Sequence, residues 1–209
     1  PAFVVAGVCL LLACGIGDVI GKPFILCVCL TLWAGGYMEK WQQEKDACGK
    51  WMYARMLYHS GGYKAANEAY EKLYPVLRGR GAFLFEYGHS LHKSFLYGDS
   101  NKYLEEACRY SSDPMVLNVM GKNYQEQHCY EQAEKFFYRA IHRLPGRIYP
   151  YYLLANLYAE PDFYKPDKLK EAADSVLTKE PKVHSTAIDE MRSEVREILK
   201  RKDKCEIKK

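Results

Sequence analysis

Apolar residues are distributed in two different ways along the chain. Up to Tyr37 they form two uncharged runs, Ala2–Gly17 and Pro23–Tyr37, which are separated by the only charged residues of this stretch, Asp18 and Lys22. Beyond this stretch, charged residues are dense and alternate with apolar and aromatic ones. The change predicts a membrane-embedded N-terminal head joined to a water-exposed body.

Within the body, small and aromatic residues recur at regular intervals. The stretch Gly121–Pro145 has them at Gly121, Tyr124, Ala133, Phe137, Ala140 and Pro145. One repeat period earlier, Gly88 takes the place of Gly121, and two periods earlier Ala66 takes the place of Ala133. The repeating units begin near Ala47, Gly81, Pro114 and Ile148, at a nearly constant spacing.

This period resembles that of the tetratricopeptide repeat (TPR), in which helix pairs of about 34 residues stack side by side. On this interpretation Gly121 lets the two helices of a pair approach closely, and Phe137 fills the space between them. Pro145 stops the second helix. The sequence therefore predicts an all-α fold with four parts: a transmembrane helical hairpin over 1–37, a TPR-like α-solenoid of about four helix pairs over 38–182, a capping helix over 183–200, and a basic disordered tail over 201–209.

Two further features of the solenoid are predicted. The second and fourth units carry short insertions at their turns, Tyr97–Ser100 and Pro161–Pro166. The capping helix covers the last hydrophobic face of the solenoid. Its apolar stripe consists of Val183, Ile188, Met191, Val195, Ile198 and Leu199.

The membrane prediction depends on the length of the apolar runs. A spanning helix needs about 20 residues to cross roughly 30 Å of hydrocarbon. The second run nearly reaches this length if it begins at Val19, with Lys22 and the aromatic Trp33 and Tyr37 near the interfaces. The first run is short at its start and Pro1 is not methionine, so we expect a piece of a longer chain.

Three other interpretations of the head compete with a membrane hairpin. A signal peptide needs a basic segment before the apolar run, and none is present. Leu11–Cys14 resembles a lipoprotein cleavage box, but a second apolar run follows too soon. A buried hairpin in a soluble protein stays open as an alternative. The cluster of Lys40, Lys45, Lys50 and Arg55 after the second run favours a cytoplasmic body by the positive-inside rule.

Charge and cysteine content exclude several classes of function. A net charge of +4 without a strong basic patch gives no reason to expect nucleic-acid binding. The eight cysteines lie in apolar runs or are scattered, and no CxxC pair occurs. Free thiols are therefore expected, in keeping with a reducing compartment.

The sequence contains no pattern typical of catalysis. His89 and His92 can share one helix face, but no third metal ligand accompanies them. No nucleophile–base order and no glycine-rich phosphate loop is present, and Gly79–Gly81 is a connector. We expect no catalytic residue, metal or cofactor in this chain.

A stack of helix pairs offers a groove lined by the first helix of each pair, and solenoids use this surface for binding. Cations, amides and aromatic rings on these helices can accept an acidic peptide or a carbohydrate. The alternative is that the same side chains are only solvated or packed. The predicted groove residues are Trp51, Arg55, Tyr58, His59, Phe85, His89, His92, Lys93, Asn118, Lys122, Gln125, Tyr152 and Asn156.

A wider resemblance rests on two phrases, "PGRIYPYYLLANLY" (Pro145–Tyr158) and "PKVHSTAIDEMRSEV" (Pro181–Val195), that follow an apolar span and helix pairs. This order resembles the C-terminal part of O-antigen ligase or polymerase family membrane proteins with TPRs. The resemblance implies the inner membrane of a Gram-negative bacterium, lipopolysaccharide biosynthesis and a polyprenyl-linked glycan substrate. The functional arginines and histidines of that family belong to a periplasmic loop that this chain lacks, so no catalytic residue is carried over.

Two functions are therefore expected to compete. The first is a membrane-anchored TPR scaffold that binds a protein partner and forms the end of a glycan ligase or polymerase. The second is a stand-alone membrane-anchored TPR adaptor without enzymatic activity. The reading frame upstream of Pro1 distinguishes them, because further spans and a long polar loop belong only to the first.

Overall fold

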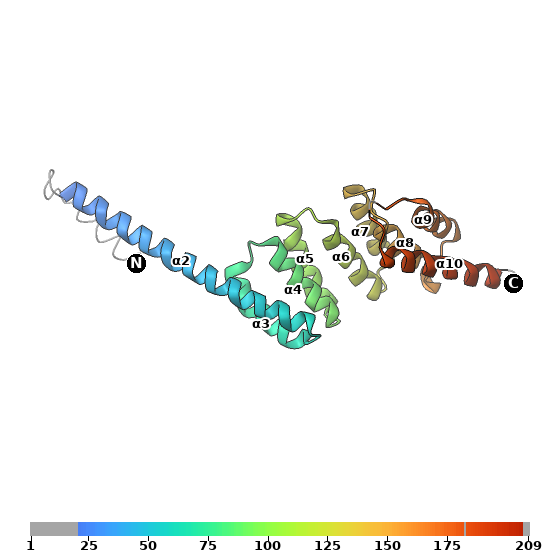
Figure 1. The fold of residues 1–209 in the computed structure, drawn as a ribbon, viewed down its shortest axis with the longest axis horizontal. Coiled ribbons are helices and arrows are strands. Elements are labelled where there is room, and N and C mark those ends of the chain that lie inside the picture. Colours follow the sequence, from blue (N-terminus) through green and yellow to red (C-terminus); the bar gives the residue numbers. More distant parts are fainter. Residues whose placement is uncertain (1–20, 182, 207–209) are drawn as a thin grey trace. The chain divides into compact units, whose positions relative to one another are not determined.

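The structure, a computed structural model, describes residues 21–181 and 183–206 (Figure 1). The predicted first membrane span, Ala2–Gly17, lies outside the described residues. The chain divides into two compact units with the boundary between Tyr53 and Ala54.

The N-terminal unit contains the first part of α2, a helix of 39 residues that runs from Gly21 to His59. The predicted second span and the first helix of the predicted solenoid are thus one continuous helix. After Tyr37 the chain continues with methionine, glutamate, lysine and glutamine, which favour helix and give no signal to stop. In the described part of the chain, no helix is both long and apolar enough to cross a membrane, and the predicted hairpin is not supported.

From Ala54 onward, the described residues form successive helix pairs. The end of α2 is followed by α3 (Tyr63–Leu77), and three more pairs come next: α4 (Gly81–Lys93) with α5 (Tyr97–Tyr110), α6 (Pro114–Glu126) with α7 (Tyr130–Arg143), and α8 (Tyr149–Ala159) with α9 (Pro166–Thr178). Each pair packs on the next, through α3 with α4, α5 with α6, and α7 with α8 (Figure 1). The predicted solenoid of helix pairs is confirmed.

The two predicted insertions differ in their outcome. Tyr97–Ser100 is not an insertion but the first turn of α5. Ser100 is fully buried there, and its hydroxyl donates to the carbonyl of Gly88 over 2.7 Å, so the turn is part of the packed pair. Pro161–Pro166 does form a connector, which contains the 3-10 helix η1 (Pro161–Phe163).

Small residues allow the two helices of a pair to approach closely. A methyl group added at Gly121 would lie 2.4 Å from the ring of Phe137, and one at Gly88 would lie 2.7 Å from Leu104. Both distances are far inside van der Waals contact. Ala54 and Ala155 occupy the same position in the first and fourth pairs and are fully buried. The expected role of Gly121 is confirmed.

The turn inside the first three pairs repeats one backbone conformation. Gly61, Phe95 and His128 have positive φ angles of 83°, 62° and 58°. The residue after each one donates its N–H back across the helix end, as Leu96 does to the carbonyl of Leu91 over 3.0 Å. This is a left-handed helix cap that satisfies the terminal carbonyls.

The last helix, α10 (Thr186–Glu206), packs on α8 and α9. Val195 is fully buried, as expected for a cap, but Val183 is 76% exposed because it precedes the helix. The helix also continues past the predicted end at Lys200, so the described residues 201–206 are helical and not a disordered tail. Glu197 and Arg201 form an ion pair of 3.6 Å one turn apart, which supports this extension.

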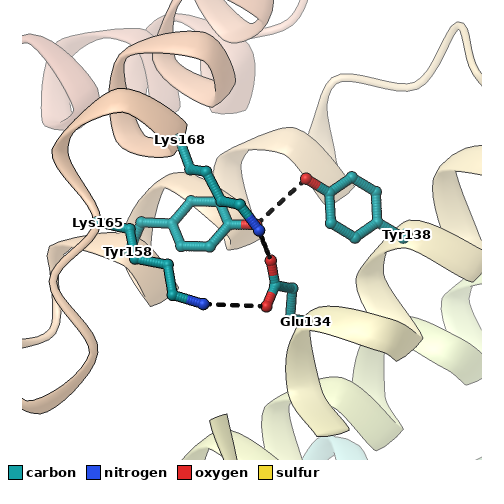
Figure 2. A network of polar contacts seen from close by, with 5 residues as sticks. All are labelled: Glu134, Tyr138, Tyr158, Lys165 and Lys168. Atoms are coloured by element: carbon teal, nitrogen blue, oxygen red, sulfur yellow. Dashed lines mark hydrogen bonds and ion pairs between the residues drawn. The ribbon is translucent and has the colours of Figure 1, made fainter. Parts of the chain in front are cut away.

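A polar network joins the third pair to the fourth (Figure 2). One oxygen of Glu134, on α7, accepts hydrogen bonds from the hydroxyl of Tyr158 and from Lys168, each over 2.6 Å. Its other oxygen lies 3.4 Å from the ammonium of Lys165. Tyr138 completes the network through a contact of 3.2 Å between its hydroxyl oxygen and that of Tyr158.

Candidate functional site

The first helices of the pairs form a continuous surface, which we call the first-helix face. Among the described helices, α4 contacts α6 and α6 contacts α8, whereas no comparable contact joins α5 to α7 or α7 to α9. The first helices α4, α6 and α8 are therefore closer together than the second helices α5, α7 and α9.

The repeat period arranges side chains on this face in rows. Three rows run across the pairs, one residue from each unit: Arg55, His89, Lys122 and Asn156; Tyr58, His92, Gln125 and Ala159; His59, Lys93, Glu126 and Glu160. In all three rows, the residues from the first two units are basic or aromatic. The last two members of the third row are acidic. The face therefore changes from basic to acidic along the stack.

At the basic end, the predicted residues contact one another across helices. The hydroxyl of Tyr58 lies 2.9 Å from Nδ1 of His89, which joins α2 to α4. The ring of His89 stacks between those of Phe85 and His92, with centroid separations of 5.7 Å and 5.9 Å. Arg55 forms an ion pair of 3.1 Å with Glu86. Of the predicted groove residues, the structure thus brings together Tyr58, Phe85, His89 and His92.

His92 joins this face to a buried polar network. Its Nδ1 lies 2.6 Å from Oδ1 of Asn123, a fully buried residue of α6. The amide nitrogen of Asn123 donates to Ser100 and to Asn101 over 2.8 Å and 2.7 Å. Because both amide protons are used, Oδ1 is the acceptor and His92 carries its proton on Nδ1. The sequence pattern did not identify Asn123, because a period reports a helix face and not a side-chain partner.

Burial and positive neighbours shift the pKa values of this region. Burial, then the charges of His92, Lys93 and Lys122, lower the pKa of His89 to about 4. Burial also lowers the pKa of His92, although its hydrogen bond with Asn123 opposes the shift. Burial and Lys93 lower the pKa of Lys122. Both imidazoles are therefore neutral at pH 7.

The acidic end of the face is a hollow of about 680 Å³. Four predicted groove residues line it: Lys122, Gln125, Tyr152 and Asn156. The remaining polar and aromatic lining consists of Glu126, Tyr149, Glu160, Glu194 and Arg201. The rings of Tyr149 and Tyr152 stack with centroids 6.2 Å apart and form an aromatic wall. The hollow thus combines an aromatic surface with carboxylates and two cations.

The carboxylates of the hollow are positioned by neighbouring helices. Gln125 of α6 donates to Glu160, at the end of α8, over 3.0 Å. The hydroxyl of Tyr152 donates to Glu194 of α10. The sequence pattern identified none of the three carboxylates as site residues. Glu126 and Glu160 lie one and two repeat periods after Lys93, so the repeat could have predicted them. Glu194 belongs to α10, which lies outside the repeats, so the repeat could not predict its position.

One predicted groove residue, Asn118, is buried and is not available on this face. Asn118 is 1% exposed, and its amide contacts Met115 while its Oδ1 has no hydrogen-bond partner. Phe85, Asn118 and Tyr152 occupy equivalent positions in successive repeats. Asn118 is buried because its helix, α6, is flanked by α4 and α8. Trp51 lies in the N-terminal unit. His59 is exposed at the end of α2.

Within the described residues, no three metal-ligating side chains cluster together. His89 and His92 lie side by side, but their Nδ1 atoms are engaged by Tyr58 and Asn123.

Comparisons with known proteins identify the fold. No protein-family model matches the chain, and no curated protein sequence matches it. Solved structures of similar fold include MamA 41-end from Desulfovibrio magneticus RS-1, with 17% identity, a TM-score of 0.55, and coverage of 71% of this chain and 76% of that chain. Another MamA crystal structure has 17% identity and a TM-score of 0.55, covering 75% of this chain and 97% of that one.

A third similar structure is YrrB, described as a TPR protein with an unusual peptide-binding site. It has 14% identity and a TM-score of 0.53, and the match covers 81% of this chain and 97% of YrrB. Together with the helix pairs, these similarities show a TPR-like α-solenoid. The comparisons give no support to the predicted relationship with O-antigen ligases or polymerases.

Proposed function

We propose that the protein is a scaffold that binds a protein or peptide segment along the first-helix face. The observation that carries this proposal is the hollow of about 680 Å³, in which an aromatic wall and charged groups from three helices converge. Such a hollow suits an extended segment with one side chain against the tyrosines and polar contacts along its backbone. The described peptide-binding site of YrrB, a protein of the same fold, supports this function.

The rigidity of the face favours binding of a flexible segment. Each first helix packs closely against its partner helix, as the contact between Gly121 and Phe137 illustrates. The protein therefore loses little conformational entropy when a peptide binds. The lining residues project from α6, α8 and α10, so a segment in the hollow contacts all three helices at once. We infer that a peptide, rather than a single small metabolite, is the ligand.

Selection of random displayed peptides on the immobilised full chain tests this function. We expect the selected peptides to bind at least tenfold more weakly to the Tyr152→Ala variant, because the aromatic wall is lost. The control is Tyr110→Ala, which removes a 54% exposed tyrosine from α5, outside the first-helix face. Failure to select any peptide, or equal binding by the two variants, would contradict the proposed function.

We further propose that residues 1–37 attach the repeats to a lipid bilayer. Support comes from the uncharged runs and from Trp33 and Tyr37 of α2, whose rings are stacked and are 71% and 61% exposed. Flotation of the full chain with phospholipid vesicles tests this attachment, and a chain that stays at the bottom of the gradient argues against it. A location in the bacterial inner membrane with a cytoplasmic body, and a link to a glycan ligase, stay predictions that the upstream reading frame tests.

A further inference from the structure

Four basic side chains gather on the first-helix face where α4 lies beside α6. His89, His92 and Lys93 belong to α4, and Lys122 occupies on α6 the position that His89 has on α4. Lys93 and Lys122 both lower the pKa of each imidazole, so the four groups lie within electrostatic reach of one another. We call these four residues the basic cluster.

Little negative charge faces the basic cluster from α5 and α6. Glu126 of α6 acts on His92 and on Lys122, in each case raising the pKa. This carboxylate is exposed, so solvent and salt screen its charge. Neither lysine of the basic cluster forms a salt bridge with any residue that the structure describes.

The remaining neighbours on α2 and α4 do not compensate the positive charge. Glu86 of α4 forms an ion pair of 3.1 Å with Arg55 of α2, so its charge is already neutralised. Tyr58 of α2 presents a neutral hydroxyl to His89. Burial raises the pKa of Tyr58, which keeps the hydroxyl protonated at neutral pH. The basic cluster therefore carries net positive charge on a partly buried surface.

Each imidazole also keeps one nitrogen for a ligand. His89 uses Nδ1 in its contact of 2.9 Å with Tyr58, and His92 uses Nδ1 in its contact of 2.6 Å with Asn123. Both of these contacts are made through Nδ1 and not through Nε2. Once protonated, each Nε2 becomes a charged donor that is held in a fixed orientation.

We propose that the basic cluster binds a side-chain carboxylate of an acidic peptide segment, and that its histidines take up protons when that carboxylate binds. This inference rests on the proposed peptide-binding function and specifies the charge of the partner over α4 and α6. The segment then runs toward the hollow, where Glu126, Glu160 and Glu194 disfavour further acidic residues.

The coupling to protons follows from the charges. In the free protein both imidazoles are neutral at pH 7, because burial and the lysines keep their pKa values low. A carboxylate beside them favours the protonated form and raises their pKa. Binding is then accompanied by proton uptake, and the affinity increases as the pH falls from about 7.5 toward about 5.5, where glutamate side chains remain ionised.

Fluorescence anisotropy with two labelled, C-terminally amidated peptides tests the inference on the full chain. One probe alternates alanine with glutamate, and the other replaces every glutamate with glutamine. We expect the glutamate probe to bind at least tenfold more tightly than the glutamine probe at about pH 6. We also expect its affinity to rise severalfold between about pH 7.5 and about pH 5.5, with proton uptake in calorimetry across buffers of different ionisation enthalpy.

Matched variants separate this site from general attraction to a cationic protein. Lys93→Gln with Lys122→Gln should reduce binding of the glutamate probe about tenfold, whereas Lys135→Gln, on the second helix α7, should leave it unchanged. His89→Gln with His92→Gln should remove the pH dependence. Circular dichroism confirms that each variant is folded, and Arg55 is left intact because its ion pair with Glu86 supports the fold.

Each outcome is decisive. No binding of the glutamate probe, equal binding of both probes, or an affinity that does not change with pH overturns the inference. If peptides selected from the random library nevertheless bind in a way that depends on Tyr152, the proposed peptide-binding function stands. In that case only the proposal of an acidic partner is wrong. If no selected peptide depends on Tyr152, the proposed function itself fails.

Discussion

Gly121 shows most directly how a single residue sets the spacing of a helix pair. A methyl group on this glycine would lie 2.4 Å from the ring of Phe137, which is itself fully buried. The ring cannot move without displacing its own neighbours, because the interior is close-packed. The absence of a side chain at residue 121 is therefore a packing requirement and not a source of flexibility.

Gly121→Ala is accordingly expected to lower the free energy of unfolding by about 1–3 kcal/mol, since it over-packs the contact with Phe137. Urea unfolding followed by circular dichroism measures the change. Gly146→Ala is the matched control, because a methyl group there has no atom within 4 Å. If both variants unfold at the same urea concentration, the close approach of α6 and α7 is not what the glycine provides.

At the level of single residues, the sequence predicts where a residue lies on its helix better than it predicts the burial or the hydrogen-bond partners of its side chain. The period located Gly121 and Phe137 within a helix pair, and counting along the first helices located His89 and Lys122 on them. It could not show that Asn118 is buried, because burial depends on how closely α4 and α8 flank α6. Nor could it reveal the bond from His92 to Asn123, which joins residues 31 apart across two helix pairs.

At the level of elements, the turns inside the first three pairs share a left-handed residue, but different amino acids occupy it. Gly61 adopts its φ of 83° at no steric cost, whereas Phe95 adopts 62° with its side chain 77% exposed. The same backbone conformation is thus relaxed in the first pair and unfavourable in the second.

Replacement at these two turns is expected to have opposite effects. Phe95→Gly should raise the free energy of unfolding by about 0.5–1 kcal/mol, because it relieves the positive φ, and Gly61→Ala should lower it by about 1 kcal/mol. Thermal unfolding of both variants measures the difference. Equal shifts in the same direction would show that side-chain contacts of Phe95, such as that with Tyr97, outweigh the backbone conformation.

The helices themselves were predictable where the stop signals are local. Pro114 begins α6, and Gly81 begins α4, as the period indicates. The prediction was wrong where no such signal exists. It divided α2 at Tyr37, where the composition changes but the helix does not, and it ended α10 at Lys200, although good helix formers continue beyond it. Composition reports solvent environment, and helix ends depend on caps.

At the level of the whole solenoid, stability is a sum over neighbouring pairs. The contact between the third and fourth pairs combines apolar packing, such as the stacked rings of Tyr130 and Phe163, with the network around Glu134 (Figure 2). Burial acts to raise the pKa of Glu134, but its bonds with Lys168 and Tyr158 and the charge of Lys165 outweigh this and lower it. The carboxylate therefore remains charged at neutral pH and attracts both lysines to α7.

Loss of this carboxylate should weaken the fourth pair selectively, because each pair contacts only its neighbours. In Glu134→Ala, the hydroxyl of Tyr158 and the two lysines lose their shared acceptor, so we expect the fourth pair to be destabilised by about 2 kcal/mol. Hydrogen exchange should then show faster exchange in α8, α9 and α10 than in α4 and α5, whereas Lys135→Ala on the same helix should change neither region. Uniformly faster exchange in all helices would mean that the stack unfolds as one cooperative unit. In that case, the hollow on α8 could not lose its shape independently of the basic cluster on α4.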